Sequence, residues 1–167
     1  MSRRLIVVFL ATALATAIAA TATMAAGPTG AKGTFKALLS GKNSVPQVKT
    51  AATGEATFLL SRDGTKLNYV IRVKDLASPI AAHIHRGTKT ENGPPMVTLY
   101  PVGRGMKAKT GRFTGELAKG VITSANLIGP LAKKTISDLV AEIKAGKTYV
   151  NVHTRAHPDG ELRGQIM

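Results

Sequence analysis

Hydrophobic and polar residues alternate along several short stretches of the chain. The clearest stretch runs from Leu67 to Val73, where Leu67, Tyr69, Ile71 and Val73 share one face. Successive side chains of a strand point to opposite faces of a sheet, so this period of two predicts a half-buried strand. The same pattern predicts strands near residues 35–39, 56–60, 81–85, 96–100, 113–117, 149–153 and 162–166. Seven or eight short strands separated by turn formers are typical of an antiparallel β-sandwich.

One segment has a helical period instead. Thr135 precedes it as a candidate N-cap, and Gly146 follows it as a candidate C-terminal stop. The apolar positions fall at i, i+3, i+4 and i+7, which places them on one helical face; they are Ile136, Leu139, Val140 and Ile143. The sequence therefore predicts an all-β fold with one short inserted α-helix, at about residues 136–145.

Strand parity also predicts which side chains form the core. The inward set comprises Tyr69, Ile71, Ile84, Val150, Val152 and Leu162. By the same parity Glu161 and Arg163 point outward together, and we expect them to form an ion pair or to orient a histidine.

The four histidines lie in two clusters. His83 and His85 flank Ile84 on one predicted strand, while His153 ends another strand and His157 lies in the turn after it. If Ile84 faces the core, both neighbouring imidazoles point away from it and can meet His153, with His157 as a fourth or replaceable ligand. Imidazoles without thiolates suit Cu(II) or Zn(II), and their affinity is expected to fall as the pH drops through about 6.5. The alternative is that the histidines only hydrogen-bond loops to the sheet.

The N-terminus has the pattern of an export signal. Arg3 and Arg4 precede an apolar run from Leu5 to about Ala20, and small residues continue to Ala26. This order predicts a signal peptide over residues 1–26, a flexible lead over 27–33 and one domain over 34–167. An uncleaved anchor is the alternative, but the run is rich in alanine and interrupted by threonine. We expect a periplasmic or extracellular protein, not an integral membrane protein.

The composition narrows the partners and the chemistry. Without Arg3 and Arg4, 21 basic and 9 acidic residues remain. This excess favours anionic envelope polymers as partners, or serves solubility alone, and another envelope protein is a further possible partner. The basic residues do not form the clustered stripe of a nucleic-acid-binding protein. The chain has no cysteine, which excludes disulfides and thiolate ligands.

Several ordered motifs resemble one known family. They are Leu39-Ser-Gly-Lys-Asn-Ser-Val-Pro46, Ala82-His-Ile-His-Arg-Gly87, Asn92-Gly-Pro-Pro95, Tyr149-Val-Asn-Val-His-Thr154 and Gly160-Glu-Leu-Arg-Gly-Gln-Ile166. Together they resemble the CHRD domain, the module repeated in chordin, over about residues 34–166. Members of that family usually have an acidic residue where this chain has Ser44, and a proline where it has Gln47. The resemblance implies an extracytoplasmic, immunoglobulin-like β-sandwich. The His-x-His strand is also similar, more weakly, to that of copper/zinc superoxide dismutases, although the larger ligand set of a two-metal site is missing.

Three functions remain open at this point. The first is binding of one copper or zinc ion by His83, His85, His153 and His157 without turnover. The second is a non-enzymatic adhesion or envelope-binding module with structural histidines. The third is a mononuclear copper redox enzyme. The chain lacks the Gly-x-Ser-x-Gly motif that places a hydrolase nucleophile at a strand-to-helix turn.

Overall fold

A computed structural model describes residues 32–101 and 108–167 of the chain. The predicted signal peptide, residues 1–26, and most of the predicted lead lie outside these residues, so both stay predictions. Within the described ranges, none of the helices has the length and apolar character needed to cross a membrane.

Eight strands form at the stretches where the alternation predicts them. They are β1 (Gly33–Ser40), β2 (Thr53–Leu60), β3 (Leu67–Ala77), β4 (Pro79–Arg86), β5 (Pro95–Tyr100), β6 (Arg112–Ile122), β7 (Thr148–Thr154) and β8 (Leu162–Gln165). The helix α1 spans Ile136–Lys144, and three short 3-10 helices span Gly41–Asn43, Ser124–Asn126 and Gly129–Leu131. The side chains of Thr135 and Asp138 cap α1 reciprocally, and Gly146 follows it with φ +66°. The predictions of an all-β fold and of one inserted α-helix are confirmed.

All eight strands belong to one antiparallel sheet, in the order β5-β4-β7-β8-β1-β2-β3-β6. The sequence predicted a sandwich of two sheets, and this detail differs because β8 pairs on both of its sides. Ser40 of β1 pairs with Arg163 of β8, and β7 pairs with the other edge of β8. Backbone hydrogen bonds between Lys36 and Met167, at 2.8 and 2.9 Å, extend the link. The sheet is therefore continuous across the position where a sandwich would be divided.

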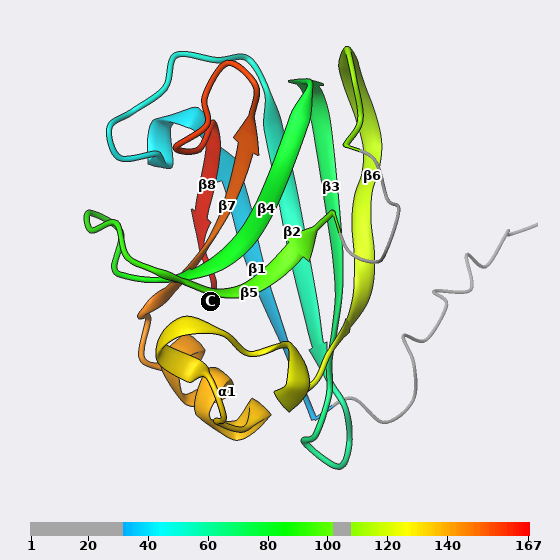
Figure 1. Cartoon of the computed structure of the whole chain (residues 1–167), viewed down its shortest axis with the longest axis vertical. Helices are drawn as coiled ribbons and strands as arrows, with labels where there is room; N and C mark the ends of the chain where they lie inside the picture. The colour runs from blue at the N-terminus through cyan, green and yellow to red at the C-terminus, as the bar shows by residue number, and fades with distance from the viewer. Residues whose placement is uncertain (1–31, 102–107) are drawn as a thin grey trace, which may run out of the picture.

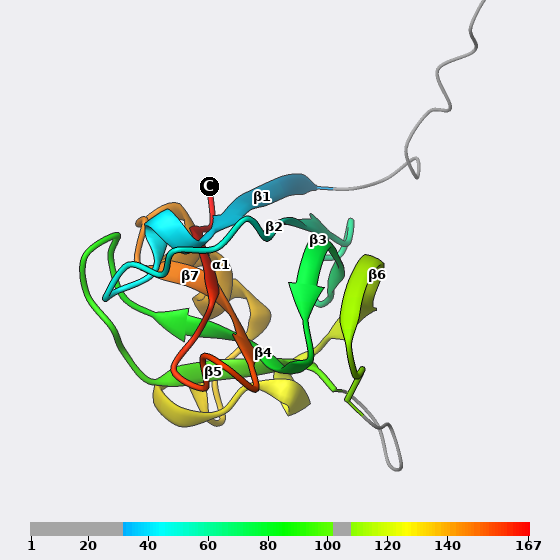
Figure 2. The ribbon, with the colours of Figure 1, turned by 90° about the horizontal axis from the view of Figure 1, so that it is seen from above.

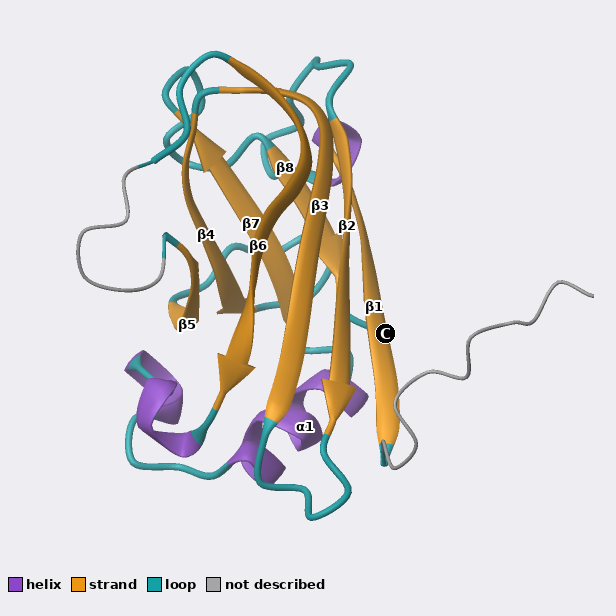
Figure 3. Ribbon diagram, turned by 90° about the vertical axis from the view of Figure 1, so that its right-hand side faces the viewer, coloured by secondary structure: helices purple, strands orange, loops and turns teal. Residues whose placement is uncertain are grey.

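The continuous sheet is rolled so that its two halves face each other. Figure 3 shows β1, β2, β3 and β6 in front of β4, β7 and β8, and the view from above shows the same curvature (Figure 2). The edge strands β5 and β6 approach each other, and the Tyr69 hydroxyl of β3 donates to the Leu99 carbonyl of β5 at 2.8 Å. The helix α1 lies at the lower end of the roll in Figure 1, where its apolar residues join the core between the halves.

The inward side chains are those that parity predicts. All six members of the predicted core set are buried: Tyr69, Ile71, Ile84, Val150, Val152 and Leu162. Val, Leu, Ile and Ala supply most of the remaining core, in keeping with the low aromatic content of 4%.

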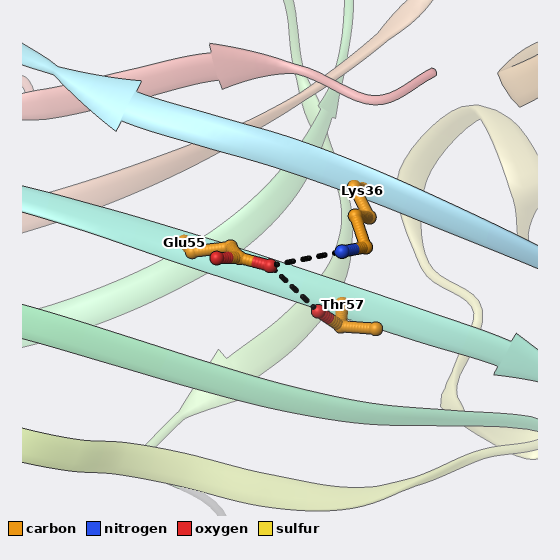
Figure 4. A network of polar contacts seen from close by, with 3 residues as sticks. All are labelled: Lys36, Glu55 and Thr57. Carbon is orange, nitrogen blue, oxygen red and sulfur yellow. Dashed lines mark hydrogen bonds and ion pairs between the residues drawn. The ribbon is translucent and has the colours of Figure 1, made fainter. Parts of the chain in front are cut away.

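The outward faces of the two halves differ from each other. On β1 and β2, Lys36 forms an exposed ion pair with Glu55 at 3.6 Å, and Thr57 donates to the same carboxylate (Figure 4). On β7, by contrast, every residue is buried. Two segments make hydrogen bonds to outward groups on or just before β7 and β8, and we call them the first covering loop (residues 41–52) and the second covering loop (residues 87–94). The Asn92 side chain joins the two loops by donating to the Val45 carbonyl at 2.6 Å.

Candidate metal centre

Strand pairing between β4 and β7 brings three of the four histidines together. Ala81 is the register partner of His153, and His83 is the partner of Asn151. Ile84 is fully buried in the core, so His83 and His85 project from the opposite face of β4. His153 projects from the same face of β7, one step along the ladder from His83. The sequence predicted this convergence on the condition that the two strands are neighbours, and they are.

The three imidazoles are close enough to share a ligand. One ring nitrogen of each residue can be chosen so that all three lie within 4.8 Å of one another. The ring centroids of His83 and His153 are 5.1 Å apart, those of His83 and His85 are 5.5 Å apart, and those of His85 and His153 are 5.8 Å apart. The closest contact joins His83 Nδ1 to His153 Nε2 at 3.2 Å.

Backbone carbonyls select the tautomers of two of these histidines. His85 Nδ1 lies 2.8 Å from the Gly93 carbonyl oxygen, and His153 Nδ1 lies 2.7 Å from that of Pro158. A carbonyl can only accept, so both Nδ1 atoms carry the proton and both Nε2 atoms present a lone pair. His83 Nδ1 donates to one of these lone pairs, that of His153. The other lone pair, on His85 Nε2, is buried and has no hydrogen-bond partner among the described residues.

The electrostatic setting keeps the cluster neutral. Burial lowers the pKa of His83 to about 4, with additional repulsion from His153 and His85. Burial also lowers the pKa of His85 and the pKa of His153, although the hydrogen bonds to Gly93 and Pro158 act in the opposite direction. Asp159 favours the charged form of His153 and so offsets part of its lowered pKa. Each imidazole is therefore neutral at neutral pH and keeps one ring nitrogen free of a proton, as a metal ligand must. The loss of metal affinity that the sequence predicted near pH 6.5 is accordingly expected at lower pH.

His157 has a different environment. Its backbone N–H donates to the Thr154 carbonyl at 3.2 Å, and its own carbonyl accepts from the N–H of Thr154 and from that of Gly160. These bonds form the turn after β7. Among the described residues, the cluster that could hold a metal comprises the other three histidines. The role of His157 as a fourth ligand therefore stays a prediction.

Two neighbours of the cluster were not found by sequence reasoning. The Tyr149 ring stacks on His85 with centroids 5.1 Å apart, and its hydroxyl accepts from the Gly93 N–H at 3.1 Å. Gly93 thus holds His85 through its carbonyl and Tyr149 through its amide. A Cβ on Gly93 would lie 2.0 Å from the Arg86 carbonyl oxygen, so the close approach requires glycine. Backbone contacts of this kind do not depend on residue type, so the sequence pattern does not reveal them. The one sequence signal near Gly93 was the turn-rich motif that begins at Asn92.

Glu161 and Arg163 do not form the predicted ion pair. No salt bridge joins them within residues 32–101 and 108–167, and neither hydrogen-bonds a histidine. The Glu161 carboxylate accepts from the Thr50 and Thr154 hydroxyls, both at 2.7 Å. The Arg163 guanidinium donates to the Thr88 and Glu91 carbonyls and to the Asn92 side chain, and it lies 3.5 Å from the Tyr149 ring. The two side chains diverge because Glu161 faces the first covering loop and Arg163 faces the second.

A comparison with known families agrees with this arrangement. The sequence model of the CHRD domain matches residues 35–166, which is nearly all of the described chain. The chain belongs to the CHRD domain family. The resemblance inferred from the motifs is thereby confirmed, and the structure shows what the motifs do in this CHRD domain. The Leu39–Pro46 and Asn92–Pro95 motifs contribute to the two covering loops, while the other three motifs lie on or beside β4, β7 and β8.

Comparisons with curated proteins and with solved structures gave no match. The chemistry of the CHRD domain therefore has to be argued from its own residues. Three unprotonated imidazoles, two of them oriented by carbonyls, form a donor set suited to a borderline divalent metal such as Zn(II) or Cu(II).

Proposed function

We propose that this CHRD domain is an exported protein that binds one divalent transition metal, copper or zinc, through His83, His85 and His153. The metal is held without turnover, and no catalytic step is assigned to it. His157 is a fourth or replaceable ligand in this proposal.

The observation that carries the proposal is the orphaned nitrogen of His85. Buried polar atoms in proteins are nearly always hydrogen-bonded, and each exception calls for an explanation. His85 Nε2 is buried without a partner, it belongs to the cluster of three histidines, and its lone pair is fixed by the bond from Nδ1 to Gly93. A metal ion shared with His83 and His153 would satisfy it.

The spacing of the cluster fits such an ion after a small adjustment. Zinc–nitrogen bonds of about 2.0–2.1 Å place the nitrogens of a tetrahedral site about 3.3 Å apart. His83 Nδ1 and His153 Nε2 are already 3.2 Å apart, and His83 Nδ1 can act as a ligand once its proton moves to Nε2. The ligand atoms of all three residues lie within 4.8 Å of one another. Rotation of the imidazole rings can close the remaining gap without movement of the strands.

The decisive experiment is a metal titration of the metal-free protein, purified without an affinity tag. Calorimetry with Cu(II) and, separately, with Zn(II) should show one site per chain, and elemental analysis should find the metal before chelation. His83→Ala and His153→Ala should each weaken binding roughly a hundredfold, because each removes one of three ligands.

His157→Ala is the matched control, since it removes a histidine from the turn beside the cluster. It should weaken binding less than either variant above. Tight binding that survives the double substitution of His83 and His85 would place the metal elsewhere. Binding no tighter than that of a single surface histidine would leave the three histidines with a structural role only.

Export is tested separately. The Arg3–Arg4 pair and the apolar run up to Ala20 support cleavage near Ala26. Mass spectrometry of the native protein should find an N-terminus near Gly27, in the periplasm or outside the cell. An intact N-terminus embedded in the membrane would contradict this part of the proposal.

A further inference from the structure

A cavity of about 520 Å³ lies on the side of β8 that faces away from the core. Its walls come from the first covering loop, from Lys89 and Thr90 of the second, and from side chains at the ends of β1 and β8. A cavity of this size is in the range of pockets that hold small molecules. The three histidines of the candidate metal centre do not line it.

The charged side chains that line the cavity are all basic. Lys42, Lys89 and Arg163 line it, and neither an aspartate nor a glutamate side chain does. The two nearest acidic side chains in sequence are engaged elsewhere: Glu91 accepts from the Thr88 hydroxyl, and Glu161 accepts from two threonine hydroxyls. This excess of basic side chains favours an anion.

Arg163 is a buried cation whose hydrogen-bond partners are all neutral. It is only 2% exposed, yet its hydrogen-bond partners are two carbonyl oxygens and one amide oxygen, all neutral. A buried charge is usually paired with an opposite charge, since removal from water is costly. Among the described residues no carboxylate pairs with Arg163. Its three hydrogen bonds use three of the five donors of the guanidinium.

Part of the exposed lining of the cavity is apolar. Leu38 is 69% exposed and Met167 is 72% exposed, and both line the cavity together with Val45 and Pro46. Large apolar side chains that are exposed beside a group of cations offer a surface for the apolar part of a ligand with an anionic head.

We propose that this cavity binds a small amphiphilic anion, in which a phosphate or carboxylate head is attached to a short alkyl chain. The head lies against Lys42, Lys89 and Arg163, and the alkyl chain packs on Leu38 and Met167. The same chemistry occurs in a free alkyl phosphate and in the headgroup region of an anionic lipid. The proposal does not depend on metal binding.

Calorimetric titration of the purified protein with hexyl phosphate tests the proposal. One saturable site per chain is expected, with an affinity that falls as salt is added. The double variant Lys42→Gln/Lys89→Gln should weaken binding roughly three- to tenfold, as expected for two exposed lysines. The control variant Lys66→Gln/Lys74→Gln removes the same charge from exposed positions on and beside β3, and it should bind like the unchanged protein. Leu38→Ser should also weaken hexyl phosphate binding and should leave binding of inorganic phosphate unchanged.

Other probes separate the two sources of the anion and define failure. Binding of hexyl phosphate without binding to phosphatidylglycerol vesicles would identify a free small anion, and vesicle binding that depends on Lys42 and Lys89 would identify a lipid headgroup. Equal losses in the two double lysine variants would overturn the proposal, because attraction would then reflect net charge alone. Equal affinity for hexanol or for inorganic phosphate would also overturn it, as would absence of binding by every probe.

Discussion

The outward faces of the two halves of the sheet both carry polar side chains, but their surroundings differ. On β1 and β2, Lys36, Glu55 and Thr57 form a contact network at the protein surface (Figure 4). His153 of β7, Arg163 of β8 and Glu161 just before β8 are buried. The covering loops hydrogen-bond Glu161 and Arg163, and the turn after β7 hydrogen-bonds His153. The first network stabilises the fold little, because exposed ion pairs contribute about 0–1 kcal/mol. The second behaves as a polar core, in which every group needs a partner.

This difference explains where the site forms. Histidines under a loop are partly dehydrated, are oriented by carbonyls and have a lowered pKa, whereas histidines on the face of β1 and β2 would stay hydrated. The same loops generate the cationic cavity, because they bury Arg163 without supplying a carboxylate. Both proposed sites therefore depend on the segments that cover this face.

The largest expected effect tests which face of β7 points inward, on which the whole comparison depends. Val152→Asp should lower the free energy of unfolding by about 4 kcal/mol or more, because it places an unpaired carboxylate at a fully buried core position. Lys66→Ala, at an exposed site before β3, is the control and should change stability by about 0.5 kcal/mol or less. Urea unfolding measures both. Comparable losses would mean that the strand parity is misassigned.

The next effect tests the polar core itself. Arg163→Met should cost about 3 kcal/mol, because three oxygens of the second covering loop lose their charged donor. Arg72→Met is matched to it. The Arg72 side chain is 70% exposed and lies 3.8 Å from Glu116, and its loss should cost about 0.5 kcal/mol or less. Hydrogen exchange should show residues 87–94 opening in the first variant only. If both variants are equally stable, the covered face is not a polar core.

A smaller effect on stability is expected from protonation of His83 on the covered face. His83 has a folded pKa of about 4 against 6.5 in the unfolded chain, so between these values only the unfolded chain binds the proton. Stability of the metal-free protein should therefore fall as the pH drops from about 6.5 to about 4, by about 1–2 kcal/mol after solvent screening, with no further loss from this group below pH 4.

Comparison with His83→Gln isolates this contribution. The difference in unfolding free energy between the unchanged protein and the variant should shrink as the pH is lowered through this window. A constant difference between pH 7 and pH 4 would show that His83 titrates normally in the folded protein.

The smallest effect is expected on the open face. Lys36→Ala removes the ion pair with Glu55 and should change the free energy of unfolding by about 0.5 kcal/mol or less. This difference should disappear in high salt, which screens the pair. Thermal unfolding at low and at high ionic strength measures it. A loss as large as that of Arg163→Met would mean that the two outward faces are equivalent after all.

The sequence correctly predicted which face of its strand each side chain lies on. It did not predict which outward side chains are buried under loops. Alternation placed Ile84 and Val152 inside and His83 and His153 on the opposite side, because parity is a local property of the backbone. Local sequence does not say which loop crosses the outward face. Glu161 and Arg163 were therefore predicted to form an ion pair or to orient a histidine, whereas each side chain bonds a covering loop. The closure of the sheet through Ser40 and Arg163 was missed for the same reason, since that pairing joins residues from the two ends of the domain.

The contributions of Gly93 and Pro158 could not be predicted at all. Both act on the histidines through carbonyl oxygens, which every residue has, and only the folded backbone decides where they lie. Ser44 is similar: its hydroxyl donates to the Glu161 carbonyl at 3.0 Å, a bond that an ionised carboxylate at this position could not make.

The position of β8 in the sheet has a consequence for the order of folding. The neighbours β1, β2 and β3 are consecutive in the chain and can pair early, but β8 must find β1 across a large sequence separation, which is a slow step. Until that step is complete, Arg163 is not in position to hold the second covering loop, and Gly93 is not in position to orient His85. We therefore expect the candidate metal centre to assemble in the last phase of folding, so that recovery of the proposed metal binding lags behind formation of the β1–β3 strands.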